Sequence, residues 1–148
     1  MRRPGGKTDA LRARPRPLMF VSDTHPFLYY ASGRRTRLGR AARRLFERAD
    51  SGEGLIYLPS IALWETARLA ARGRFDLHLR FDHWCRSIEG SRGFSIAALE
   101  WLDVDTARTL PFADPYDCLI AGTALRMALP LITRDEEIVR SRLVETVW

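Results

Sequence analysis

Four carboxylates are the residues of this sequence best placed to do chemistry. Each stands just past an apolar run that is typical of a buried strand, or in the opening turns of an expected helix. They come from distant parts of the chain: Asp23, Glu65, Asp117 and Asp135. Four carboxylates in one crevice repel one another, and some would stay protonated without a cation. A hard divalent cation removes that conflict, and Mg²⁺ or Mn²⁺ prefers carboxylate and water oxygens.

Histidines and cysteines offer no comparable metal chemistry. His78 and His83 are five positions apart and lack an H-E-x-x-H context. No other spacing of Cys and His favours zinc. His25 stands close to Asp23, where it is either a general base or, more commonly, a loop residue that makes a hydrogen bond.

The same acids have a structural interpretation, because Asp is a preferred residue at the start of a helix. Asp114, followed by Pro115 and Asp117, makes a good helix start with Asp114 as the N-cap. Thr133 and the acids after it fit a capping box, in which Asp135 is a first-turn acid that the helix dipole stabilises. The sequence therefore leaves open whether these residues cap helices or take part in catalysis.

Glu65 fits a structural interpretation least well. Its helix neighbours at i−4, i−3 and i+4 are apolar, namely Ile61, Ala62 and Leu69. A surface glutamate would avoid such a stripe, and a buried one needs a partner. Asp23, by contrast, could cap the helix that follows it.

The elements that must position these acids follow from apolar periodicity. Strands are expected at 94–98 or 99–104 and at 18–21, 55–58, 129–133 and 144–148. Helices are expected at 24–30, 33–50, 60–72, 77–89, 105–110, 114–128 and 136–141. Strands that alternate with helices predict a three-layer α/β/α fold around a central parallel sheet of four or five strands. The ligand crevice of such a sheet lies beyond the carboxyl ends of its strands, where the four acids would meet.

Composition and charge exclude several classes of protein. The chain has 148 residues, 46% hydrophobic and 28% charged, which suits one globular domain and excludes a wholly disordered chain. It has no apolar run near the ~20 residues of a membrane span and no secretory signal. Two cysteines suit a reducing cytoplasm. Residues 1–17 carry six Lys and Arg and one Asp, a net +5 of the total +6, and we interpret them as a disordered basic tail before a folded domain at 18–148.

Five segments of the chain stand in a specific order, and their most specific part is a D-P-aromatic-D block followed by an L-x-T-x-D block. The segments are MFVSDTHPFLYY, LPSIALWETARL, LPFADPYDCLIAGTAL, LPLITRDEEI and VETVW. Together, over residues 19–148, they resemble the PIN-domain ribonucleases, and in particular the VapC-type toxins of toxin–antitoxin pairs. The resemblance implies a PIN fold that hydrolyses RNA with Mg²⁺, or with Mn²⁺, and that forms a homodimer and binds a VapB-like antitoxin.

The resemblance also implies roles for individual residues. Asp23, Glu65, Asp117 and Asp135 would form the catalytic, metal-binding pocket. Asp114 would be an additional metal ligand, and Thr133 would position a water molecule or a carboxylate at the substrate.

Arginines close to the predicted crevice are candidates for holding an RNA strand. Arg34, Arg35 and Arg37 closely follow the first acidic segment, and Arg134 lies between Thr133 and Asp135. Arginines there would contact phosphates without reading bases. The alternative interpretation is that these arginines form a basic face that is only solvated and binds nothing.

Two further functions stay open on the sequence. A PIN nuclease can act in RNA processing or repair rather than as a toxin. A non-catalytic RNA-binding PIN module would lack the acids, and here all four are present.

Overall fold

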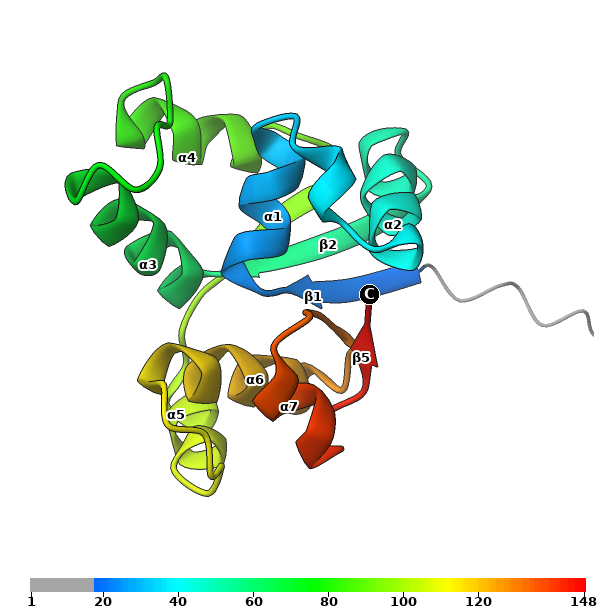
Figure 1. Cartoon of the computed structure of the whole chain (residues 1–148), viewed down its shortest axis with the longest axis vertical. Helices are drawn as coiled ribbons and strands as arrows, with labels where there is room; N and C mark the ends of the chain where they lie inside the picture. Colours follow the sequence, from blue (N-terminus) through cyan, green and yellow to red (C-terminus); the bar gives the residue numbers. More distant parts are fainter. Residues whose placement is uncertain (1–17) are drawn as a thin grey trace, which may run out of the picture.

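A five-stranded parallel sheet forms the centre of the protein in the computed structural model, which describes residues 18–148 (Figure 1). The predicted disordered tail at 1–17 lies outside the described residues. The strand order is β3-β2-β1-β4-β5, and every pairing is parallel. The strands are β1 Leu18–Ser22, β2 Gly54–Pro59, β3 Phe94–Ala97, β4 Leu131–Ile132 and β5 Thr146–Val147. The predicted α/β fold with a central parallel sheet is confirmed.

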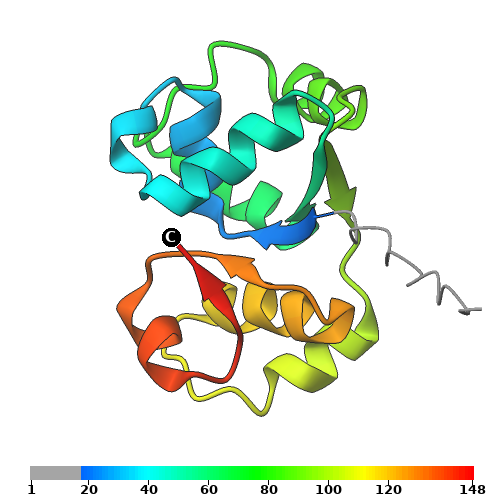
Figure 2. The same cartoon turned by 90° about the vertical axis from the view of Figure 1, so that its right-hand side faces the viewer.

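Helices cover both faces of this sheet. Figures 1 and 2 show α1 to α4 on one side and α5 to α7 on the other. Their bounds are α1 Thr24–Ala31, α2 Arg40–Asp50, α3 Ser60–Ala71, α4 Phe81–Glu89, α5 Trp101–Ala107, α6 Pro115–Met127 and α7 Glu136–Ser141. The chain runs outward from β1 through β2 to β3, and then returns to β4 on the opposite side of β1. Because crossovers between parallel strands are right-handed, this reversal moves the later helices to the other face.

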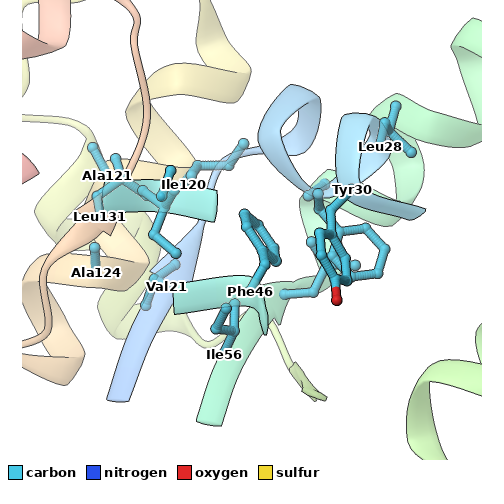
Figure 3. Close-up of a cluster of buried hydrophobic side chains, with 14 of the residues drawn as sticks. Val21, Leu28, Tyr30, Phe46, Ile56, Ile120, Ala121, Ala124 and Leu131 are labelled. Carbon is cyan, nitrogen blue, oxygen red and sulfur yellow. The ribbon is translucent and has the colours of Figure 1, made fainter. Parts of the chain in front are cut away.

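Aromatic and aliphatic side chains fill the space between the sheet and α1 and α2. Phe46 of α2 is fully buried and stacks on Tyr30 of α1, with ring centroids 5.0 Å apart (Figure 3). Val21 of β1 and Leu131 of β4 are also fully buried. This packing fixes the ends of β1 and β4, from which the acidic residues emerge. Among residues 18–148, no helix is long and apolar enough to cross a membrane.

The prediction of a single helix at 33–50 is wrong, because this segment forms a 3₁₀ turn at Arg35–Arg37 and then the separate helix α2. Gly33 has a φ of 74°, which ends α1, and Leu38 is extended and buried. Gly39 precedes α2, and any side chain there would collide with Trp148. Tertiary contacts at positions 38 and 39 therefore override the helical spacing.

The alternative strand at 99–104 is also wrong, since β3 occupies Phe94–Ala97 and a helix begins at Trp101. Asp103 starts that helix by accepting a hydrogen bond from the Glu100 amide at 2.8 Å. The helix expected at 105–110 accordingly lies earlier in the chain, as α5. The helix expected at 77–89 begins only at Phe81, after His78 adopts a φ of 55°.

Candidate active site

The site lies at the carboxyl ends of β1 and β4, where the connections that follow these two neighbouring strands run to opposite faces of the sheet. These strands are neighbours, and the Asp23 amide donates a 3.0 Å hydrogen bond to the Ile132 carbonyl. Asp23 follows β1 and Thr133 follows β4. The crossovers leave β1 and β4 over opposite faces, which opens a crevice between the two segments.

A pocket of about 360 Å³ occupies this crevice. It brings together all four acids expected from the sequence, together with the additional acid Asp114. Histidine, proline, aromatic and arginine side chains complete the wall. The lining residues are Asp23, His25, Pro26, Tyr29, Glu65, Asp114, Asp117, Arg134, Asp135 and Trp148.

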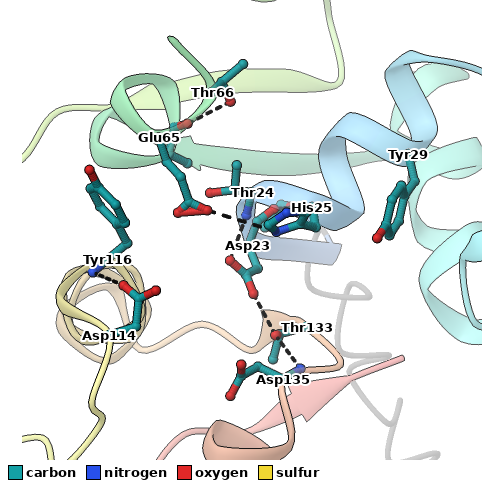
Figure 4. A network of polar contacts seen from close by, with 12 residues as sticks. Asp23, Thr24, His25, Tyr29, Glu65, Thr66, Asp114, Tyr116, Thr133 and Asp135 are labelled. Carbon is teal, nitrogen blue, oxygen red and sulfur yellow. Dashed lines mark hydrogen bonds and ion pairs between the residues drawn. The ribbon is translucent and has the colours of Figure 1, made fainter. Parts of the chain in front are cut away.

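A chain of hydrogen bonds joins the two sides of the crevice (Figure 4). The Thr133 hydroxyl donates to Asp23 Oδ2 at 2.7 Å and accepts from the Asp135 amide at 3.1 Å. The other oxygen of Asp23 accepts from the Thr24 amide at 2.7 Å. Thr133 therefore orients one acid directly and the backbone of a second. It is fully buried and is not a pocket-lining residue.

Three of the pocket acids also cap helices. Asp23 caps α1, Asp114 caps α6 through the Tyr116 amide at 2.7 Å, and Asp135 caps α7 through the Ile138 amide at 3.0 Å. Asp135, rather than Thr133, is the N-cap of α7, so the capping box expected from Thr133 is wrong. Because a cap fixes one carboxylate oxygen against the backbone, it holds the side chain at the pocket wall. The structural and chemical interpretations of these residues are compatible.

Glu65 and Asp117 lie in the pocket without capping a helix. The Glu65 side chain comes from α3 and is only 15% exposed. Burial raises the pKa of Glu65 to about 7, and the charges of Asp23 and Asp114 add to the rise. Burial also raises the pKa of Asp117 to about 8, with further contributions from the neighbouring acids, Asp23 first. Without a cation, Asp117 would be mostly protonated at neutral pH and Glu65 about half protonated.

The donor set fits a hard divalent cation. All the acids offer oxygen ligands, and the buried Thr24 hydroxyl lies beside Glu65, where it favours the ionised carboxylate (Figure 4). Within residues 18–148, no three His, Cys, Asp or Glu side chains already converge closely enough to enclose one ion. Mg²⁺ requires no such cage, because it usually keeps several waters and takes one or two carboxylates. The pocket therefore suits a hydrated cation better than a closed structural site.

An aromatic cradle that the sequence analysis missed holds Arg134 at the pocket. Its guanidinium carbon lies 5.6 Å from the ring centres of both Tyr29 and Trp148, and its Nη2 donates to the Tyr29 hydroxyl at 3.3 Å. Among the described residues, Arg134 forms no ion pair with a carboxylate. Tyr29 is four positions after His25, a spacing that puts both on one helix face and is visible in the sequence. Nothing local in the sequence points to Trp148.

The other arginines proposed from the sequence do not all reach the site. Arg34 and Arg37 line a second pocket beside the acidic one. Arg35 lines neither pocket, and its guanidinium carbon lies 4.9 Å from the ring centre of Tyr30. His25 lines both pockets, with its Nδ1 4.0 Å from Glu65 Oε1.

Two solved structures share this fold at low sequence identity. One is VapBC2 from Rickettsia felis bound to a DNA fragment from its promoter, with a TM-score of 0.63 and 15% identity over 88% of this chain and 99% of that one. The other is DNA-bound VapBC from Salmonella typhimurium, with a TM-score of 0.59 and 19% identity over 88% and 97%. No curated protein is similar enough to this chain to count as a match.

A family comparison covers most of the folded chain. The PIN domain family matches residues 20–142, which run from within β1 to the end of α7 and include every acid of the pocket. With the parallel sheet and its crevice at β1 and β4, this match shows that the chain belongs to the PIN domain family.

Proposed function

We propose that this protein is a divalent-metal-dependent endoribonuclease and the toxin of a VapBC-type pair. The observation that carries the nuclease proposal is the pocket itself, in which four carboxylates and Asp114 gather at the crevice of a PIN fold. Phosphodiester hydrolysis requires an electrophilic centre that binds phosphate and activates water. Clustered carboxylates with raised pKa values supply the ligands for such a centre.

Each acid has a proposed role in this chemistry. Asp23 and Asp117 would be the principal ligands of Mg²⁺ or Mn²⁺, and Glu65 and Asp135 would complete the set, in part through waters that the cation keeps. Asp114, which is exposed and already caps α6, contributes less. Bound metal would supply Lewis-acid activation of water and neutralise charge at the phosphate.

Polar and basic residues around the acids position the reactants. The Thr133 hydroxyl orients Asp23 by donating to its Oδ2, and this hydrogen bond opposes the rise in the Asp23 pKa that burial causes. Arg134 lies in the pocket with no described carboxylate paired to it, so its guanidinium is available to a phosphate oxygen. Arg34 and Arg37 line the adjoining pocket, which supports a role for them in holding the strand beyond the scissile bond.

The toxin proposal rests on fold and family. The two similar solved structures are VapBC complexes, and the present chain covers 99% and 97% of those chains. We propose a VapB-like antitoxin as the partner, a homodimer as the assembly and the cytoplasm as the location. A PIN nuclease of RNA processing or repair would use the same pocket, and an experiment in cells separates these two roles.

Induced expression of the protein alone, followed by sequencing of RNA 5′ ends, tests the whole proposal. A toxin gives growth arrest with cleavage at discrete sites, and Asp117→Asn abolishes both. Asp105→Asn is the matched control, because Asp105 is an exposed acid on α5 that pairs with Arg108 away from the pocket. Cleavage without arrest would favour RNA processing over a toxin. Unchanged cleavage by Asp117→Asn, or by the purified protein in excess EDTA, would refute the nuclease proposal.

A further inference from the structure

A second, basic pocket of about 230 Å³ adjoins the acidic one. Its charged wall consists of three arginines, one of which, Arg74, was not singled out from the sequence. The remaining wall is aromatic and aliphatic. Its lining residues are His25, Leu28, Tyr29, Arg34, Arg37, Leu69, Arg74 and Phe75.

Two of these arginines each follow a left-handed glycine at the end of a helix. α1 is followed by Gly33 with a φ of 74°, and α3 is followed by Gly73 with a φ of 67°. At the end of α3, the Arg74 amide donates to the Leu69 carbonyl at 2.9 Å, as in a Schellman motif. Each left-handed glycine turns the chain back, so Arg34 and Arg74 follow directly at the ends of two adjacent helices.

The three guanidiniums are free to bind an anion. In the part of the chain that the structure describes, Arg34, Arg37 and Arg74 form no ion pair with a carboxylate, and all three residues are exposed. This sets them apart from arginines such as Arg140, which pairs with Glu136 at 3.1 Å. Three unpaired positive charges around one pocket repel one another, and a bound anion relieves that repulsion.

Tyr29 physically connects the two pockets. It lines both of them, and the guanidinium carbons of Arg37 and Arg134 lie 5.7 and 5.6 Å from the centre of its ring. Arg37 belongs to the basic pocket and Arg134 to the acidic one. Because Tyr29 lines both pockets, a ligand that leaves the acidic pocket over Tyr29 enters the basic pocket directly.

We infer that the basic pocket is a subsite for a backbone phosphate of single-stranded RNA, next to the phosphate that is cleaved. This inference deepens the proposed function and rests on it for the position of the scissile bond. Arg34, Arg37 and Arg74 bind the flanking phosphate, and Tyr29 separates the two phosphate positions. Such a series of charged and aromatic groups is how proteins track a single strand.

RNA suits this pair of pockets better than an acidic peptide does. A phosphodiester strand carries a charge at every linkage, so one phosphate reaches the carboxylates through a cation while its neighbour meets the arginines. Guanidinium groups also match phosphate oxygens in bidentate geometry. Glutamate side chains have neither the fixed spacing nor a linkage that the acidic pocket could cleave.

The first test measures binding of a fluorescein-labelled, random-sequence single-stranded RNA by anisotropy, with the full-length protein in EDTA. Arg37→Ala and Arg74→Ala should each weaken binding about tenfold at low salt and lower the salt dependence by about one counterion. Arg72→Ala is the matched control, because Arg72 is exposed two positions before Arg74 and does not line the pocket. Equal losses in Arg72→Ala and Arg74→Ala would overturn the inference, and so would a loss in Arg35→Ala as large as that in Arg37→Ala.

The second test locates the phosphate. In an RNA that the wild-type protein cleaves, single phosphates are replaced in turn by neutral methylphosphonates. At one position beside the cleaved bond, the replacement should raise KM about tenfold and should make Arg74→Ala as active as wild type on that RNA. If no position shows this coupling, the basic pocket does not bind a backbone phosphate.

These tests separate the inference from the proposed function. RNA binding that requires Arg37 and Arg74, in a protein that cleaves no RNA, would support the subsite and refute the nuclease. Metal-dependent cleavage with unaltered binding in both variants would do the reverse. Polyglutamate that displaces the RNA at an equal concentration of charge, and that also requires Arg74, would assign the pocket to an acidic peptide and overturn the inference.

Discussion

The Thr133 hydroxyl donates a 2.7 Å hydrogen bond to Asp23 Oδ2 across 110 positions of sequence. Both side chains are buried, at 0% and 8% exposure. Burial raises the pKa of Asp23, while the hydrogen bonds from Thr133 and from the Thr24 amide lower it. The hydroxyl thus stabilises the ionised carboxylate that a cation requires.

Replacing Thr133 by Val should weaken metal binding and catalysis together. Loss of a buried hydrogen bond to a charged group corresponds to about 1.5–3 kcal/mol, so the Mg²⁺ concentration for half-maximal cleavage should rise at least tenfold. Titration of RNA cleavage with Mg²⁺ measures this change. Thr133→Ser keeps the hydroxyl and should retain near wild-type metal dependence. Equal defects in Val and Ser would show that Thr133 acts through packing alone.

The metal-free protein should lose stability as the pH rises from 5 to 8.5. Burial and neighbouring acids raise the pKa of Asp117 from 3.8 to about 8 and that of Glu65 from 4.5 to about 7. In this window the folded protein binds protons that the unfolded chain has released, so deprotonation favours unfolding. The stabilising effect is complete below the ordinary carboxyl pKa and is lost as the pH passes the raised values.

Urea unfolding in EDTA at several pH values measures this loss. Asp117→Asn should flatten the decline, because the amide does not titrate, whereas Asp105→Asn should follow the wild type. Added Mg²⁺ should stabilise the wild-type protein most at high pH, since the cation binds the ionised carboxylates. A pH-independent midpoint for the metal-free wild type would contradict this prediction.

Arg134 should contribute to turnover through the cradle formed by Tyr29 and Trp148. Arg134→Met removes the positive charge but keeps much of the side-chain length, and we expect kcat/KM to fall at least tenfold, equivalent to about 1.4 kcal/mol. Trp148→Ala leaves the guanidinium less well positioned, so its effect should be smaller. Steady-state cleavage of a labelled RNA measures both variants. Arg140→Ala, on the exposed face of α7, serves as the comparison.

The ion pair between Asp103 and Arg126 should matter for stability and not for chemistry. Asp103 is fully buried on α5, and Arg126 of α6 donates to it through Nε. Arg126→Leu leaves a buried carboxylate unpaired and should lower the free energy of unfolding by about 3–5 kcal/mol. Replacing both residues by Leu should restore part of that loss. Urea unfolding of the two variants tests this, and RNA cleavage at low temperature should stay at the wild-type rate in the folded fraction of each.

The amino-acid sequence determines the elements and the identity of the acids. Apolar runs mark the strands because buried strands need apolar side chains on both faces, and Asp114 and Asp135 mark helix starts because a carboxylate satisfies free backbone amides. Such signals are local, so they can be read without knowing the fold. They fail at Leu38 and Gly39, where distant contacts interrupt a helical pattern.

Only the tertiary structure decided which residues meet. The order β3-β2-β1-β4-β5 places the segment after β1 beside the segment after β4, and so creates the contact between Asp23 and Thr133. The same arrangement places Tyr29 and Trp148 around Arg134, gathers Arg74 with Arg37, and turns Arg35 toward Tyr30. These relationships depend on strand order and on crossover handedness, which bring together side chains far apart in the chain. No periodicity within a segment carries that information.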